Sequence, residues 1–191
     1  GDFLTVDDHQ SYQQAAAGCQ WTSIAGLVEG LRMIKDEAEI ALMRKAAAIA
    51  DEAFAQILPL IRPGVTERDL ATELEYRMKK LGAAGVAFET IVASGARSSL
   101  PHGTASDKKV ESGDLVTFDF GALYQGYCSD MTRTVMVGEP TDKQREIYGI
   151  VLEAQKRGVA ACRPGITGKE LDDVCRSYIA EKGYGEYFGH G

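Results

Sequence analysis

The chain has 191 residues, of which 45% are hydrophobic and 26% charged, and its formal net charge is −7. This composition is ordinary for a globular protein, whereas the acidity and the lack of a Lys/Arg block argue against nucleic-acid or acidic-membrane partners. No apolar stretch approaches the roughly 20 residues of a transmembrane helix, no signal peptide is visible, and the four cysteines lack CxxC spacing, so we expect reduced thiols and a cytoplasmic location.

The first 34 residues are weakly patterned. Residues 10–18 predict a short helix, and residues 21–33 predict a strand and a turn. This segment is too short to bury a core of its own. We therefore interpret residues 1–34 as the tail of an N-terminal domain with its linker, and residues 35–191 as a separate domain.

Two helices are predicted after residue 35. Acidic residues in a first helical turn are favoured by the helix dipole, and Pro63-Gly64 provides a stop signal. Thr66 and Asp69 then predict a capped start for the next helix, which Gly82 ends. The first helix has an apolar residue at every third or fourth position: Ile40, Met43, Ala47, Ala50, Phe54, Ile57 and Ile61.

Strand-like runs follow at Val86–Ala93, Leu115–Phe120 and Tyr127–Val137, and then helices at residues 142–161 and 167–182. The junction Arg62-Pro63-Gly64-Val65-Thr66 is repeated, with one conservative change, as Arg163-Pro164-Gly165-Ile166-Thr167, at an offset of 101 residues. An acidic residue and a leucine follow in both copies. This match favours an internal duplication whose second copy is incomplete in the sequence.

Two aspartates lie in adjoining strand-like runs that predict a β-hairpin. A turn centred on Tyr124-Gln125 would place Asp119 opposite Asp130, with their Cβ atoms about 5 Å apart on one side of the sheet. Like charges so placed are destabilising unless something compensates. A divalent cation held by both carboxylates, a shared proton, or a basic neighbour such as Arg133 would each do so. A register shifted by one residue would instead separate the two side chains.

The chain contains three histidines. His9 lies in the polar N-terminal stretch, where we expect a surface position. His102 follows a proline and precedes a glycine in a predicted loop, which suits a residue that touches substrate and equally a structural loop histidine. His190 lies between two glycines, so its ring could be approached closely, although a residue at this position could also have no role.

Four motifs along the chain resemble, in residue type and in their order, those of the pita-bread metallopeptidases. The resemblance is strongest to the Xaa-Pro aminopeptidases and dipeptidases (prolidases). The resemblance covers about residues 22–191. Residues 31–40 resemble the junction between a creatinase-like N-terminal domain and the catalytic domain. On this resemblance, residues 35–191 would form a catalytic domain that is incomplete at its C-terminal end. The motifs are Leu100-Pro101-His102-Gly103, Gly113-Asp114 with Asp119 and Gly121, Gly126-Tyr127 with Ser129-Asp130 and Thr132-Arg133-Thr134, and Gly189-His190-Gly191.

The resemblance implies roles for four residues. Asp119 and Asp130 would be metal ligands, with Asp130 bridging two divalent ions, and His190 would be a third ligand. His102 would line the substrate pocket and steady the tetrahedral intermediate. Manganese is the expected metal, with cobalt or zinc as alternatives. The two remaining ligands would be glutamates after Gly191, so the 191-residue polypeptide alone is expected to be inactive.

The expected fold is an α/β pita-bread fold: a curved antiparallel sheet with two pseudo-twofold-related helix pairs, the second half being incomplete. The expected activity is metal-dependent hydrolysis of the bond between an N-terminal residue and proline, by a homodimer when full length, without nucleic-acid or membrane partners. Dipeptidase and aminopeptidase remain equally open. The alternatives are a methionine aminopeptidase-like enzyme, a non-catalytic pita-bread binding module and a two-carboxylate hydrolase without metal.

Overall fold

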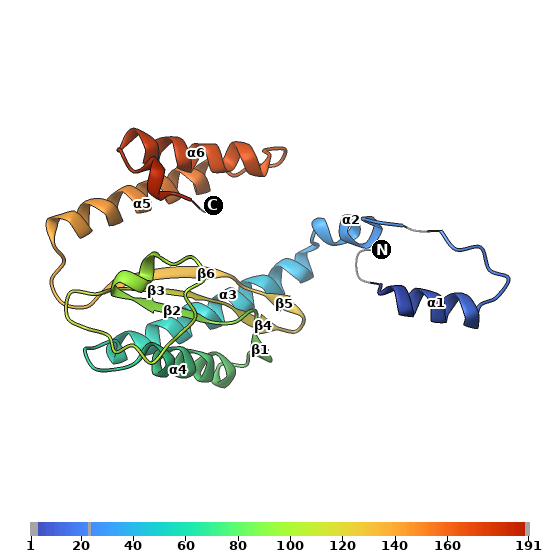
Figure 1. The fold of residues 1–191 in the computed structure, drawn as a ribbon, viewed down its shortest axis with the longest axis horizontal. Coiled ribbons are helices and arrows are strands. Elements are labelled where there is room, and N and C mark those ends of the chain that lie inside the picture. The colour runs from blue at the N-terminus through green and yellow to red at the C-terminus, as the bar shows by residue number, and fades with distance from the viewer. Residues whose placement is uncertain (1–3, 23, 190–191) are drawn as a thin grey trace.

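A computed structural model describes residues 4–22 and 24–189. Its N-terminal part contains helices α1 (Val6–Ala15) and α2 (Leu27–Met33), which extend away from the rest of the molecule (Figure 1). No residue of either helix is buried. The strand and turn predicted at residues 21–33 are therefore wrong in the part that forms α2. Leucine, glutamate, arginine and methionine favour a helix there and outweigh Val28 and Gly30.

The first helix pair consists of α3 (Glu37–Ile57) and α4 (Glu67–Lys80), joined through a short 3₁₀ turn at Leu58–Leu60. Both helices begin with a capping box, formed at α4 by Thr66 and Asp69 as predicted. Helix α3 ends four residues before the predicted Ile61. Pro59 explains the difference, because proline lacks an N–H group and disfavours the helical conformation of the residue before it.

The strands form two three-stranded antiparallel sheets with the orders β1-β4-β5 and β2-β3-β6. Two predicted strands are interrupted: residues 87–90 separate β1 from β2, and Ser129-Asp130 separates β5 from β6. A further short strand, β4, was not predicted. The bounds are β1 Gly85–Val86, β2 Ile91–Ser94, β3 Leu115–Phe120, β4 Ala122–Tyr124, β5 Tyr127–Cys128 and β6 Met131–Met136.

The hydrophobic core lies between strand β3 and the first helix pair. Alternate β3 residues, including Phe118 and Phe120, are fully buried, and both rings contact Phe54 of α3 at centroid distances of 5.4 Å. Because successive side chains of a strand point to opposite faces, Thr117 and Asp119 are directed to the other face. Packing of the even-numbered residues on α3 thus fixes the face on which the candidate site lies.

The second helix pair is α5 (Asp142–Ala161) and α6 (Gly168–Glu181), followed by a 3₁₀ turn at Gly185–Tyr187. Helices α4 and α6 both have 14 residues and begin 101 positions apart, so the duplicated junction produces the same local structure twice. Figure 1 draws α5 and α6 above the strands and α4 below them. Within the described part of the chain, no helix is long and apolar enough to cross a lipid bilayer.

Candidate metal centre

The hairpin that carries the two aspartates has a register displaced by two residues from the prediction. Its turn lies at Gln125-Gly126, where both residues have positive φ angles, 47° and 87°, as a two-residue turn of type I′ requires. Asp119 consequently faces Thr132 and not Asp130. A displacement by two, unlike one by a single residue, keeps side chains on the predicted face. The alternative of a one-residue shift is therefore wrong.

The ladder is interrupted beside Asp130 by a close backbone approach. A Cβ atom on Gly121 would lie 1.9 Å from the carbonyl oxygen of Ser129, so only glycine fits at this position. Ser129 replaces the lost pairing: its hydroxyl accepts from the N–H of Ala122 at 2.9 Å, and its own N–H donates to the Ala122 carbonyl at 3.0 Å. Asp130 itself is exposed and lies between β5 and β6, next to the buried Ser129.

The electrostatics of Asp119 connect three of the predicted site residues. Burial raises the pKa of the Asp119 carboxyl, and the negative charge of Asp130 raises this pKa further. A hydrogen bond donated by the Thr132 hydroxyl at 3.4 Å and the positive charge of His102 act in the opposite direction. Asp119, Asp130 and His102 thus lie within electrostatic reach of one another.

Among the described residues, neither a lysine nor an arginine compensates this pair of carboxylates, and His102 is the basic side chain that acts on Asp119. Arg133 instead forms an ion pair with Asp51 at 3.1 Å and donates to the Thr132 carbonyl at 2.9 Å. Across residues 4–22 and 24–189, no lysine or arginine forms an ion pair with either aspartate. Neutralisation by Arg133 or a lysine is therefore wrong, whereas a bound cation and a shared proton stay predictions.

His102 lies at the edge of the same sheet. Its turn follows the 3₁₀ helix Gly95–Ser99 and leads to Thr104, which forms a β-bridge with Ile91. Ile91 in turn pairs with Asp119, so Thr104, Ile91 and Asp119 follow one another across the sheet. His102 is exposed in this turn, and its charge acts on Asp119 across the edge of the sheet.

The donor chemistry of this centre suits a divalent cation. Carboxylate oxygens are hard ligands that suit Mg²⁺ and Mn²⁺, and Zn²⁺ accepts them too. Among the residues that the structure describes, no group of three or more His, Cys, Asp or Glu side chains is placed to hold a metal ion. Asp119 and Asp130 thus fit the cation in kind but supply only part of a ligand set. His190, the predicted third ligand, lies outside the described residues.

One buried carboxylate, that of Glu67, is not predicted by the sequence motifs. Glu67, the first residue of α4, is 0% exposed and accepts hydrogen bonds from Ser94, Arg97 and Ser106. A signal was available in the duplication, because the equivalent position of the second copy is Gly168. A charged residue that one copy has and the other lacks indicates a role beyond the helix start.

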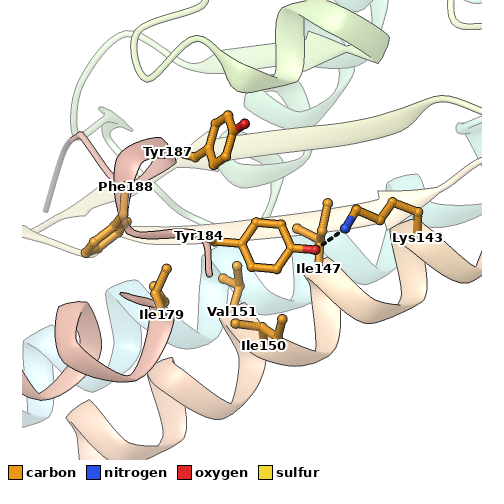
Figure 2. Close-up of a pocket in the computed structure, with 8 residues that line it drawn as sticks. All are labelled: Lys143, Ile147, Ile150, Val151, Ile179, Tyr184, Tyr187 and Phe188. Carbon is orange, nitrogen blue, oxygen red and sulfur yellow. Dashed lines mark hydrogen bonds between the residues drawn. The ribbon is translucent and has the colours of Figure 1, made fainter. Parts of the chain in front are cut away.

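An apolar groove of about 460 Å³ lies on the second helix pair. Figure 2 shows Ile147, Ile150 and Val151 of α5 along it, with Tyr184 hydrogen-bonded to Lys143 at one side. Among the residues that the structure describes, neither a carboxylate nor a histidine lines this groove. It therefore offers no metal-binding chemistry, and the acidic pair on the sheet remains the candidate site.

Comparison with known proteins supports a peptidase. Residues 41–191 match the model of metallopeptidase family M24. A Xaa-Pro dipeptidase of Pyrococcus horikoshii is 54% identical over 171 residues, which are 90% of this chain and 49% of that protein. An uncharacterized peptidase of Bacillus subtilis is 54% identical over 187 residues, 98% of this chain and 53% of that protein. The chain thus spans about half the length of these relatives.

Solved structures agree closely with the fold. A Xaa-Pro dipeptidase from Bacillus anthracis has a TM-score of 0.95 and 56% identity, with 99% of this chain and 53% of that chain covered. A prolidase from Pyrococcus furiosus has a TM-score of 0.93 and 49% identity, with 99% and 56% covered. The expectation of a pita-bread α/β fold, seen over about half of the neighbours' length, is confirmed.

Proposed function

Because the chain belongs to metallopeptidase family M24, we propose that the protein is a metal-dependent peptidase that hydrolyses the bond between an N-terminal residue and proline. The observation that carries the proposal is the pair Asp119 and Asp130, two neighbouring carboxylates that form no ion pair with a lysine or arginine among the described residues. The names of the Pyrococcus and Bacillus anthracis relatives support the choice of an Xaa-Pro substrate.

In this proposal Asp119 and Asp130 hold two divalent cations, together with His190 and with carboxylates from outside the described residues. The bound cations would polarise the scissile carbonyl and lower the pKa of the attacking water. His102, at the open edge of the sheet, would donate a hydrogen bond to the oxygen on which negative charge develops. The half-buried position of Asp119 strengthens these electrostatic interactions by limiting access of water.

The finer parts of the proposal rest on the residue types and on the family resemblance. Manganese is proposed as the metal because both donors are carboxylate oxygens, with cobalt or zinc as alternatives. A cytoplasmic location agrees with four cysteines that form no disulfide among the described residues. A homodimeric full-length protein, without nucleic-acid or membrane partners, is proposed from the resemblance and from the net charge of −7.

The decisive experiment removes one carboxylate charge at a time from the metal-loaded full-length protein, because the 191-residue polypeptide alone is expected to be inactive. Asp119→Asn and Asp130→Asn should each abolish turnover of an Ala-Pro substrate and lower the metal content, because an amide is a poor replacement for an anionic ligand. Asp107→Asn is the matched control, since Asp107 is an exposed carboxylate paired with Arg68. Metal analysis and circular dichroism would accompany the kinetics. Unchanged turnover of the Asp130→Asn protein would overturn the assignment.

His102→Ala separates catalysis from metal retention. We expect kcat to fall roughly 10²-fold or more, the usual loss for a missing proton-transfer or oxyanion partner. Metal content should stay near that of the unmodified protein, because His102 is not among the proposed ligands. Loss of the metal together with activity would instead assign His102 to coordination.

Two assays distinguish the alternatives. A Met-Ala-Ser peptide offered beside an Ala-Pro peptide separates a methionine aminopeptidase-like enzyme from a proline-directed one. A chelator should stop the proposed reaction, whereas a hydrolase that uses two carboxylates and a shared proton would be insensitive to it. Turnover of neither peptide by the metal-loaded full-length protein would favour a non-catalytic binding module.

A further inference from the structure

Glu67 uses both carboxylate oxygens to hold two segments that are distant in sequence. Its Oε1 accepts from the N–H and the hydroxyl of Ser94, at 2.7 and 2.8 Å. Its Oε2 accepts from Arg97 Nε at 3.1 Å and from the N–H and hydroxyl of Ser106, at 3.1 and 2.6 Å. Five donors thus converge on one carboxylate that is fully removed from solvent.

These donors stand on both sides of His102 in the chain. Ser94 is the last residue of β2, before the loop that carries His102, and Ser106 lies four residues after this histidine. Arg97 adds a cross-link inside the loop, because its Nη2 donates to the Thr104 carbonyl at 2.7 Å. The residues on either side of the 95–105 loop, Ser94 and Ser106, are therefore bound to the same carboxylate.

The helix that begins at Glu67 does not need this side chain. Thr66 and Asp69 already form the capping box of α4, and the same box in the second repeat works with Gly168 at the equivalent position. Burial of a carboxylate is costly unless hydrogen bonds replace its water. Burial alone would raise the pKa of Glu67, but the bonds from Ser106 and Ser94 outweigh it and lower this pKa. An ionised Glu67 is thus retained for the loop.

We propose that Glu67 is a positioning residue for the reaction: its carboxylate fixes the 95–105 loop so that His102 is held at the edge of the Asp119–Asp130 centre. This inference rests on the proposed function. Glu67 itself bonds to Ser94 of β2 and to Arg97 and Ser106, which lie on either side of His102 in the chain. Charge-assisted hydrogen bonds suit this task, because they are shorter and stronger than neutral ones.

The test is a double-mutant cycle in the metal-loaded full-length protein. Glu67→Gln should lower kcat for an Ala-Pro substrate roughly 10- to 100-fold, the range expected when a catalytic group is displaced by about 1 Å, while metal content stays normal. In the His102→Ala background the same substitution should change kcat less than about twofold, because a residue that acts through His102 has no further effect once it is removed. Glu73→Gln, which removes a carboxylate of α4 paired only with Arg77, should leave kcat unchanged.

Hydrogen exchange supplies a readout that is independent of activity. Glu67→Gln should accelerate exchange of the amides at Gly103, Thr104 and Ser106 while the amides of α3 keep their protection. If Glu67→Gln does not fold, Arg97→Gln removes the loop cross-link from a partly exposed position and should give the same pattern at smaller size. Additive effects in the cycle, or unchanged exchange of the loop, would overturn the proposal. An inactive unmodified full-length protein would overturn the proposed function, and hydrogen exchange would then decide alone whether Glu67 holds the loop.

Discussion

The two helix pairs of this chain share their local sequence signals but differ in what they bury. Helices α4 and α6 have equal lengths, a threonine capping box and a preceding glycine of positive φ, 92° at Gly64 and 87° at Gly165. Among the described residues, the first pair buries many apolar side chains, whereas the second buries only Ala154, Gly158 and Ile179. Equal helix boundaries thus coexist with unequal packing.

The sheet accounts for this difference. Phe54 of α3 packs on two phenylalanines of β3, so the apolar face of the first pair is covered by strands. The second pair packs mainly within itself: a Cβ on Gly158 would come within 2.7 Å of Cys175 Sγ, which marks a close contact between α5 and α6. Apolar residues of α5 on its other faces, such as Tyr148, Val151 and Val159, remain exposed. Local chemistry sets where a helix begins and ends, and tertiary contacts decide how much it stabilises.

The largest expected difference between the pairs is at an equivalent leucine. Leu70 of α4 is 1% exposed, whereas Leu171 of α6 is only partly buried. Leu70→Ala should lower the free energy of unfolding by about 2–5 kcal/mol, because it leaves a cavity in a closed core. Leu171→Ala should cost about 1 kcal/mol, since its surface is already partly in water. Urea unfolding of both variants measures the two values, and equal losses would contradict the comparison.

A second difference concerns pH and depends on Glu67, which has no counterpart in the second pair. Its pKa is lowered in the folded protein, so its stabilising effect is fully present above the unfolded value of about 4.3 and is lost as pH falls through the folded value. Glu67→Gln should therefore be less stable than the unmodified protein at neutral pH, by about 1–3 kcal/mol. This gap should narrow below about pH 4. Urea unfolding across pH 3–7 measures it, and a constant gap would exclude an ionised Glu67.

Features that depend on short sequence patterns were predictable. The bounds of β3 and α5 and the capping box of α4 are confirmed, and the repeated junction precedes two helices of equal length, because caps, alternation and Pro-Gly junctions are local signals. The pairing register of the hairpin differs from the prediction by two residues. Its turn places Gln125 at positive φ, which is uncommon for a residue other than glycine. The interruption before Asp130 depends on a close approach between Gly121 and Ser129, which periodicity does not reveal.

The residues of the candidate site could be predicted from the sequence, but the buried carboxylate that holds the neighbouring loop could not. Asp119, Asp130 and His102 were named from motifs, and the structure brings them into electrostatic reach of one another, while their roles stay predictions. Glu67 escaped notice because its partners are 27–39 residues away in sequence. His190 lies outside the described residues, so its role as a ligand also stays a prediction.

The smallest predicted effect is the loss of a helix cap, which should be equal in the two helix pairs. Thr66 and Thr167 each accept a hydrogen bond from the N–H group three residues ahead, at 3.0 and 3.2 Å, and each caps a 14-residue helix. Thr66→Ala and Thr167→Ala should each cost about 1 kcal/mol of helix stability, because a cap satisfies one backbone donor wherever the helix packs. Hydrogen exchange in the first turns of α4 and α6 would measure both losses, with Thr→Ser at each position as a control that keeps the cap. If Thr66→Ala lowers helix stability several-fold more than Thr167→Ala, the neighbouring sheet contributes to the cap of α4. The stability of a helix end would then depend on tertiary contacts as well as on its cap.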